Sequence, residues 1–210
     1  MRWLFVPGLA CRTDVWEAAA AHLPGVEPVL LEWPWPETLD SMDAVGEWLG
    51  AQVDRHQPAG IVGHSLGGFT ALHLYGHLAR RPLLPLVIVD TFLAHPHPVF
   101  RNHLWEPAPA LRERVTAMLA EERPRFPRLR EATMGYEETP EWVAAAMATG
   151  AAFLYGGRGG DHTDSELARL AGLPEGAPNP VSVLPGTSHF LMLEKPAEFY
   201  ALLRKAMRLA

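Results

Sequence analysis

Residues 60–68 read GIVGHSLGG, a short apolar run that ends in the pattern Gly-x-Ser-x-Gly around Ser65, and a helix-compatible segment follows. A sharp turn between a strand and a helix projects a serine hydroxyl toward a base, but it crowds the residues two before and two after the serine. Gly63 and Gly67 lack the side chains that would clash there. The pattern therefore predicts a strand, a nucleophile turn and a helix, with the backbone N–H of Leu66 placed to stabilise an oxyanion.

Length and composition limit the classes to which the chain can belong. Its 210 residues predict one domain, and a hydrophobic fraction of 48% is enough for a large core. The net charge of −6 provides no basic footprint, so we expect no nucleic-acid partner. The single cysteine, Cys11, cannot form an internal disulfide, which favours a reducing compartment and a cytoplasmic location. No run approaches the roughly 20 apolar residues of a membrane span, so we expect no membrane partner. The sequence leaves the oligomeric state open.

Apolar runs alternate with helical patterns along the chain. We expect a strand that ends at the serine turn and further strands at residues 3–6, 29–31, 83–89, 151–155 and 181–184. The alternation predicts a mostly parallel α/β sheet of about six strands with helices on both faces. Ser65, Asp90, the glycine-rich loop at 156–161 and His189 each follow a predicted strand. Because sites in such sheets lie beyond the carboxyl ends of the strands, we expect these residues to converge on one edge.

Helical patterns fill the intervals between the strands. Thr13 or Asp14 could cap a helix that ends near Leu23, and Ser41 could cap a second helix. The helix after Ser65 is expected to extend to about residue 79. Later helical patterns cover residues 111–120, 140–148, 165–170 and 196–209.

Three stretches resemble the α/β-hydrolase superfamily. The first is the serine turn, and the second is Pro7-Gly8-Leu9, which looks like the family's oxyanion loop although the family usually has His-Gly there. The third is residues 186–196, which look like the family's histidine loop and the start of its final helix. The resemblance implies an α/β-hydrolase core over residues 1–90 and 151–210, with a helical cap inserted at residues 91–150.

The resemblance also implies a serine hydrolase with a catalytic triad. Ser65 would be the nucleophile, and His189 would be the general base and then the general acid. The backbone N–H groups of Leu9 and Leu66 would form the oxyanion hole. The chain order of serine, acid and histidine agrees with the family.

Three aspartates are candidates for the triad acid. Family members most often place the acid a few residues past the strand at 151–155, but the usual Gly-x-x-Asp spacing is absent and Asp161 comes late. Other members place it at the end of the preceding strand, where Asp90 fits without an insertion. We favour Asp90, with Asp161 as the second candidate and Asp164 as the third.

The expected reaction is hydrolysis of a carboxylic ester or thioester of a small, fairly apolar substrate through an acyl-serine intermediate. It needs no cofactor and no metal. His73 and His77 have the i, i+4 spacing of metal ligands on a helix, but we expect packing or surface roles for them. Because one fold serves many chemistries, the alternatives are a ligand sensor with little turnover, a C–C bond hydrolase and an acyltransferase.

Overall fold

A computed structural model describes residues 1–34, 39–93, 104–134, 140–158, 162–176 and 180–209. Within them, six strands form one sheet in the order β2-β1-β3-β4-β5-β6, and all neighbouring strands are parallel. The strands are β1 (Arg2–Val6), β2 (Glu27–Leu30), β3 (Gly60–His64), β4 (Leu86–Val89), β5 (Ala152–Gly156) and β6 (Val181–Leu184). The predicted parallel α/β sheet is therefore confirmed.

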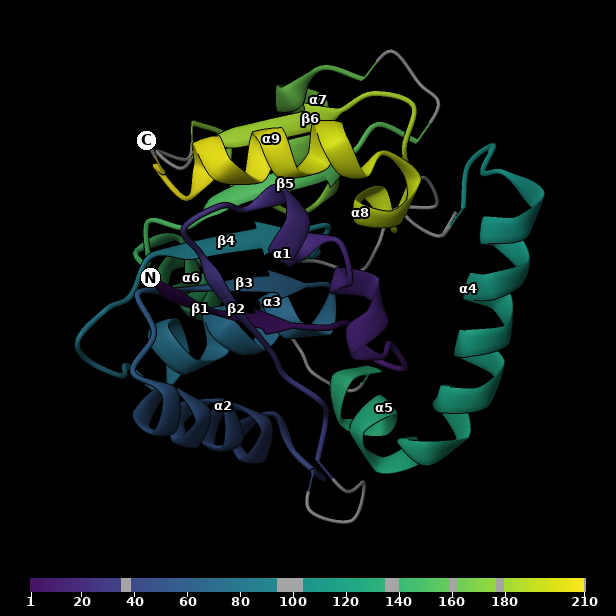
Figure 1. Cartoon of the computed structure of the whole chain (residues 1–210). Helices are drawn as coiled ribbons and strands as arrows, with labels where there is room; N and C mark the ends of the chain where they lie inside the picture. Colours follow the sequence, from purple (N-terminus) through teal and green to yellow (C-terminus); the bar gives the residue numbers. More distant parts are fainter. Residues whose placement is uncertain (35–38, 94–103, 135–139, 159–161, 177–179, 210) are drawn as a thin grey trace.

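Helices cover both faces of the sheet (Figure 1). One face carries α1 (Ala19–His22), α8 (Leu191–Glu194) and α9 (Pro196–Ala206). The other carries α2 (Met42–His56), α3 (Leu66–Leu72), the π-helix η3 (His73–His77) and α6 (Pro140–Met147). The remaining helices are η1 (Thr13–Trp16), α4 (Pro109–Glu122), η5 (Arg123–Arg125), α5 (Pro127–Met134) and α7 (Asp164–Leu170). No helix of the described residues is long and apolar enough to cross a membrane.

The strands place alternate residues in two apolar cores. In β1, Leu4 and Val6 pack in the core under α2 and α3, whereas Trp3 and Phe5 pack in the core under α1 and α9. Each such side chain contributes about 1.5–3 kcal/mol when it is fully buried. A strand buried on both faces is held in a fixed position, so the residues that follow it have fixed positions as well.

The order of the strands reverses at β1, which lies between β2 and β3. Loops from neighbouring strands leave toward opposite faces at such a switch point, and a crevice opens there beyond their carboxyl ends. The turn after β1 and the serine turn after β3 flank this point. The topology therefore brings the two predicted halves of the oxyanion hole together.

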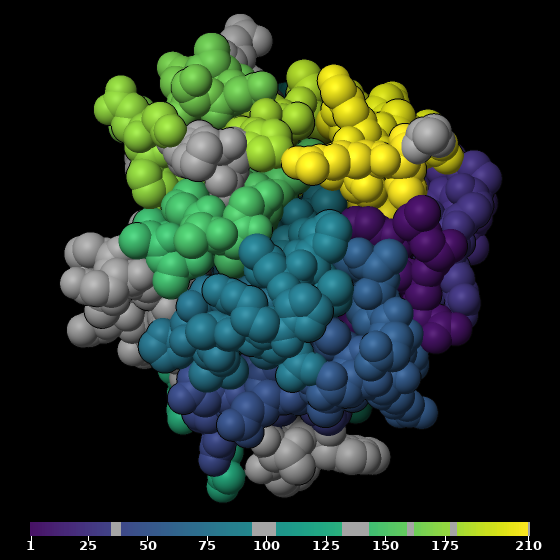
Figure 2. All heavy atoms as spheres, turned by 90° about the vertical axis from the view of Figure 1, so that its left-hand side faces the viewer, coloured from purple at the N-terminus to yellow at the C-terminus, as the bar shows by residue number. Residues whose placement is uncertain are grey.

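Segments from both ends of the chain close the face that carries α9. Figure 2 shows the yellow C-terminal segment against purple N-terminal residues. The rings of Trp16 and Phe199 lie 6.2 Å apart, and His22 stacks on Tyr200 at 5.3 Å. This packing fixes α9, and with it the loop that carries His189.

Helix α4 lies beyond the edge toward which the strands point (Figure 1). Arg114 holds it against η1, because its Nη1 donates to Glu17 Oε1 at 2.8 Å and its Nη2 donates to the carbonyl of Asp14 at 3.1 Å. By contrast, α6 packs on η3 at a face of the sheet. The division into a core and a cap at residues 91–150 stays a prediction.

Two helix predictions need correction, and one is confirmed. The helix expected from Thr13 to Leu23 is instead the short 3-10 turn η1 followed by α1, and neither candidate cap residue caps it. The carboxylate of Asp14 lies 3.6 Å from Arg12 and 3.4 Å from Arg114, so it forms ion pairs with both arginines instead of capping the helix. Ser41 caps α2 as expected, since its side chain accepts from Ala44 N at 3.2 Å.

The helix after the serine turn also differs from the expected regular helix. It changes after α3 into the π-helix η3. In this wider turn, Gly76 lies directly against α6, where a Cβ would come within 3.0 Å of the carbonyl carbon of Ala145. The close approach of two helix backbones at this point needs a residue without a side chain.

Candidate active site

Ser65 lies on a strained turn directly after β3. Its φ of 53° and ψ of −120° place it in a region that L-residues rarely adopt. A Cβ on Gly63 would lie 2.5 Å from the carbonyl oxygen of Gly67, and a Cβ on Gly67 would overlap the carbonyl oxygen of Val6. The crowding expected from the Gly-x-Ser-x-Gly pattern is therefore present, and only glycine fits at both flanking positions.

Hydrogen bonds from β4 and the residues after it hold this turn. The N–H of Ser65 donates to the carbonyl of Val89 at 2.9 Å, and Thr91 Oγ1 donates to the carbonyl of Ser65 at 2.9 Å. Leu66 is the first residue of α3, so its N–H belongs to the first helical turn, which has no acceptor within the helix. The amide of Leu66, rather than that of Ser65, is the donor suited to a developing oxyanion.

The turn after β1 lies directly against the serine turn. A Cβ on Gly8 would come within 3.1 Å of both Ser65 Cβ and His64 Nδ1. Two bonds to the carbonyl of Gly8 hold the turn, one from Cys11 N at 3.1 Å and one from Trp33 Nε1 at 2.9 Å. The turn that contains Leu9 therefore lies next to Ser65, and the resemblance assigns the second oxyanion donor to Leu9.

Cys11 lies in the same turn but is unsuited to nucleophilic chemistry. Its side chain is buried, and burial, followed by the negative charge of Asp14, raises the pKa of the thiol to about 12. A thiol must ionise to act as a nucleophile. Cys11 therefore stays protonated at neutral pH, and the hydroxyl of Ser65 is the nucleophile that this region offers.

The structure brings His189 and Asp90 together. Nδ1 of His189 donates to Oδ2 of Asp90 at 2.7 Å, and both residues are buried. Asp90 directly follows β4, and His189 lies in the loop between β6 and α8. Because Nδ1 carries the donated proton, Nε2 is the nitrogen that can accept a proton from a nucleophile.

The loop that carries His189 is anchored on both sides. The N–H of Ser188 donates to Glu194 Oε2 at 2.5 Å, and the Ser188 hydroxyl donates to Oε1 of the same carboxylate. Burial raises the pKa of Glu194, and the bonds from Ser188 oppose that rise. His64 Nε2 donates to the carbonyl of His189 at 2.8 Å. Since His64 directly precedes Ser65, this bond ties the histidine loop to the serine turn.

The sequence interpretation missed Arg158. Its Nη1 donates to Asp90 Oδ1 at 2.8 Å, and its Nη2 donates to Asp90 Oδ2. The N–H of Gly156 also donates to Oδ1, at 3.0 Å. Burial alone would raise the pKa of Asp90, but the charge of Arg158, followed by the bond from His189, holds it well below the usual range. The available signal in the sequence was an arginine within the glycine-rich loop after β5.

The other two candidate acids occupy different positions. Asp161 lies outside the described residues. Asp164 is the exposed first residue of α7, in a helical turn that begins with the capping box of Thr163 and Glu166. Of the two candidates that the structure describes, Asp90 is the one hydrogen-bonded to His189.

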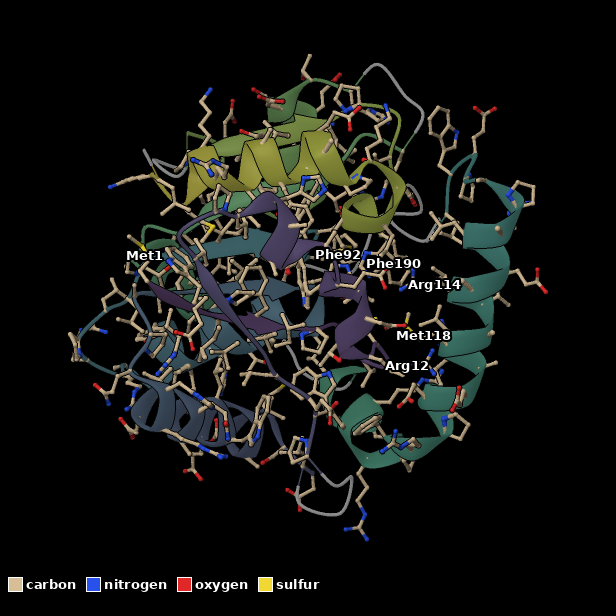
Figure 3. The ribbon with its side chains drawn as sticks, in the orientation of Figure 1. Met1, Arg12, Phe92, Arg114, Met118 and Phe190 are labelled. Carbon is tan, nitrogen blue, oxygen red and sulfur yellow. The ribbon has the colours of Figure 1, made fainter. Side chains whose placement is uncertain are left out.

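Aromatic rings surround the histidine. The ring of Phe92 stacks 6.2 Å from the ring of His189, and the ring of Phe190 lies 5.2 Å away at nearly a right angle. Figure 3 shows Phe92 and Phe190 at the edge of the sheet that faces α4, with Arg114 and Met118 on the side of α4 turned toward the sheet. Two apolar rings therefore border the histidine, in addition to its polar neighbours Asp90 and His64.

A cavity of about 310 Å³ adjoins the turn after β1. Its lining mixes charged and apolar side chains from η1, the segment after β2, and the end of α4 with η5: Cys11, Arg12, Thr13, Asp14, Glu32, Trp33, Glu122, Arg125 and Phe126. Several of these charges are paired, as in the 2.7 Å bond from Arg125 to Glu122. Ser65 and His189 do not line this cavity.

One cluster among the described residues has metal-ligand chemistry. Ligand atoms of Asp43, His73 and His77 lie within 4.8 Å of one another. His73 Nε2 donates to Asp43 Oδ1 at 2.7 Å, and the two imidazole rings stack at 4.7 Å. Burial lowers the pKa of His73, while the bond to Asp43 opposes that effect. The bond ties η3 to α2, a structural role that needs no ion.

Comparisons with known proteins agree with this architecture. A model of the alpha/beta hydrolase family matches residues 3–202. No curated protein matches the chain. Among solved structures, an esterase from Exiguobacterium antarcticum aligns with a TM-score of 0.76 and 10% identity over 99% of this chain and 92% of that chain. An esterase from Rhodococcus sp. ECU1013 aligns with a TM-score of 0.70 and 14% identity, over 100% of this chain and 90% of that chain.

A solved structure that is described as a bromoperoxidase, and not as an esterase, has the same fold. A bromoperoxidase from Bacillus anthracis aligns with a TM-score of 0.71 and 13% identity over 99% of this chain and 91% of that chain. At such identities the likeness concerns the fold, whereas the family match covers nearly the whole sequence. The chain belongs to the alpha/beta hydrolase family.

Proposed function

We propose that the protein is a serine hydrolase that cleaves a carboxylic ester or thioester through an acyl-serine intermediate. The observation that carries the proposal is the bond from His189 Nδ1 to Asp90, in a loop tied to the serine turn through His64. It orients an imidazole whose Nε2 can accept a proton from a serine on a strained turn. No cofactor takes part.

Acylation begins when the hydroxyl of Ser65 attacks the substrate carbonyl carbon. His189 Nε2 takes the hydroxyl proton as the new C–O bond forms, and Asp90 stabilises the resulting imidazolium. The amides of Leu9 and Leu66 donate to the oxyanion of the tetrahedral intermediate. Loss of one such donor costs roughly 10²–10³ in rate, so catalysis depends on the position of the turn after β1 as well as on the triad.

Collapse of the intermediate releases the alcohol or thiol, which takes its proton from His189. A water molecule then gives a proton to the same nitrogen and attacks the acyl carbonyl. The second tetrahedral intermediate collapses to a carboxylic acid and regenerates Ser65. The four donors on Asp90 keep it ionised through both steps.

The substrate is expected to be small and fairly apolar. Phe92 and Phe190 support this expectation, because their rings border the histidine and favour an apolar group there. We also expect the protein to act in the cytoplasm, which is consistent with a single buried thiol.

The experiment uses p-nitrophenyl esters of increasing acyl length, with purified wild type and Ser65→Ala measured side by side. We expect release of p-nitrophenol by the wild type, a maximum at short to medium acyl chains, and only background hydrolysis by the variant. Equal rates in the two proteins would contradict the proposal. Tight, saturable ligand binding without turnover would favour the sensor alternative.

A further inference from the structure

The carboxylate of Asp90 is shared between two cationic partners. Oδ2 accepts from both His189 Nδ1 and Arg158 Nη2, while Oδ1 accepts from Arg158 Nη1 at 2.8 Å and from Gly156 N at 3.0 Å. The side chain of Arg158 is 1% exposed and that of Asp90 is fully buried. A paired guanidinium and carboxylate at this depth are costly to desolvate and contribute little net stability. The pair therefore calls for a functional explanation.

Arg158 is itself held in a strained and specific position. Its φ is 52°, in the left-handed region that a non-glycine residue rarely adopts. Its N–H donates to the carbonyl of Thr187 at 2.6 Å, two residues before His189, and its Nη1 also donates to the carbonyl of Gly156 at 2.8 Å. Arg158 thus connects the loop after β5, the residue after β4 and the histidine loop.

We propose that Arg158 is a positioning residue of the triad, which fixes the Asp90 carboxylate toward His189 and offsets part of the negative charge that the imidazole feels. The inference rests on the proposed function for its kinetic consequence, but not for its electrostatic one. A guanidinium fork binds both carboxylate oxygens and prevents rotation of the carboxylate, which a single ammonium cannot do.

The positive charge of Arg158 opposes the positive charge that His189 gains during catalysis. When His189 gains a proton during catalysis, the new positive charge meets a second positive charge across one carboxylate oxygen. Two like charges that share one buried carboxylate oxygen repel each other, and this repulsion opposes protonation of the imidazole. Removal of the Arg158 charge should therefore make the imidazole easier to protonate, and this is the change that the test measures.

Other titratable groups face the same pair from neighbouring elements. They are His64 at the end of β3, Tyr155 in β5 and Glu194 in α8. Glu194 interacts with both Asp90 and Arg158. The charge of Arg158 opposes the rise in the pKa of both Tyr155 and Glu194, so a variant that keeps this charge is needed beside one that removes it.

The test compares Arg158→Gln, which removes the charge, with Arg158→Lys, which keeps the charge but loses the fork. Arg2→Gln is the matched control, because Arg2 forms an exposed ion pair with Glu27 at 3.0 Å. Two readouts are needed: the pH dependence of kcat/KM on a p-nitrophenyl ester, and an NMR titration of the His189 imidazole. The NMR signal is assigned by its absence in His189→Gln, and it requires no turnover.

We expect Arg158→Gln to move the NMR midpoint of His189, and the acid limb of kcat/KM, upward by about one to two pH units. We expect Arg158→Lys to keep the midpoint within about 0.5 unit while kcat falls about tenfold at constant KM, since only orientation is lost. The control should match the wild type in both readouts.

An unmoved NMR midpoint in Arg158→Gln would overturn the electrostatic part, and a wild-type kcat in Arg158→Lys would overturn the positioning part. If Arg158→Gln does not fold by circular dichroism, Arg158→Lys alone decides, because a wild-type kcat in that variant refutes the proposal. If no ester is hydrolysed by any variant, the proposed function fails, while the NMR midpoints still test the effect of Arg158 on the imidazole.

Discussion

Replacement of Asp90 by asparagine removes the negative charge around which the site is built. In the folded protein this carboxylate accepts four hydrogen bonds, two from Arg158 and one each from His189 and Gly156. The amide NH₂ of an asparagine is a donor, so it cannot accept from these N–H groups on that side. The variant leaves the guanidinium of Arg158 buried without a counter-charge, which costs about 3–5 kcal/mol in the free energy of unfolding.

The loss should be visible in both stability and rate. For a chain of this size, 3–5 kcal/mol lowers Tm by roughly 6–20 °C. The imidazole also loses the group that selects its tautomer and stabilises its charged form, so kcat should fall by about 10³–10⁴. The assay is p-nitrophenyl ester hydrolysis at a temperature at which circular dichroism shows the variant to be folded.

The controls are Asp164→Asn and Asp161→Asn. Asp164 is exposed on α7, so its replacement should change the free energy of unfolding by less than about 0.5 kcal/mol and leave kcat within twofold. A folded Asp90→Asn protein with near wild-type kcat would refute the assignment of Asp90. A greater loss in Asp161→Asn than in Asp90→Asn would refute it as well and would transfer the role to Asp161.

Three further outcomes follow from the same contacts. Gly63→Ala should lower the free energy of unfolding, measured by chemical denaturation, by more than about 3 kcal/mol, because a Cβ there meets the carbonyl of Gly67. The control Gly25→Ala, which has open space at φ 82°, should lower it by about 1 kcal/mol. Trp33→Phe removes the 2.9 Å bond to the carbonyl of the oxyanion turn, so kcat should fall several-fold with about 1 kcal/mol of lost stability; an unchanged kcat would contradict that role. Folding lowers the pKa of Asp90, so the ionised carboxylate contributes its full stabilisation above about pH 4 and loses it as the pH falls below that value. The free energy of unfolding in urea should therefore fall more steeply between pH 5 and pH 3 in the wild type than in Asp90→Asn. Equal pH dependence would contradict the linkage.

The sheet could be predicted because buried parallel strands have a direct signal in the sequence. Runs such as Ala152–Tyr155 are apolar throughout, and the strand they form is buried along its whole length. The serine turn was predictable for a similar local reason, since Gly63 and Gly67 are required by contacts within a few residues. Local sterics and burial are the forces that a short stretch of sequence reports.

Features that depend on partners distant in the chain were harder to predict. The ion pair of Asp90 and Arg158 joins residues 68 positions apart, and the residues next to each of them in the sequence do not indicate the pairing. The same holds for Asp14, which was expected to cap a helix but instead forms an ion pair with Arg114 of α4. A charged side chain has several possible partners, and only the folded arrangement of elements selects one.

The choice among the candidate acids illustrates the same limit. Position in the sequence allowed Asp90 and Asp161, because a loop of glycines can fold in many ways. The structure supplies a hydrogen bond for Asp90 but describes nothing of Asp161. The role of the acid therefore stays a proposal that the paired asparagine variants decide.

The central claim is that Ser65 forms a covalent acyl intermediate. Intact-protein mass spectrometry after incubation with a fluorophosphonate, followed by peptide mapping, measures this directly. The account predicts one adduct per chain, located on the peptide that contains Ser65, and no adduct in Ser65→Ala. An unlabelled wild type, or an equal extent of labelling in the variant, would contradict it.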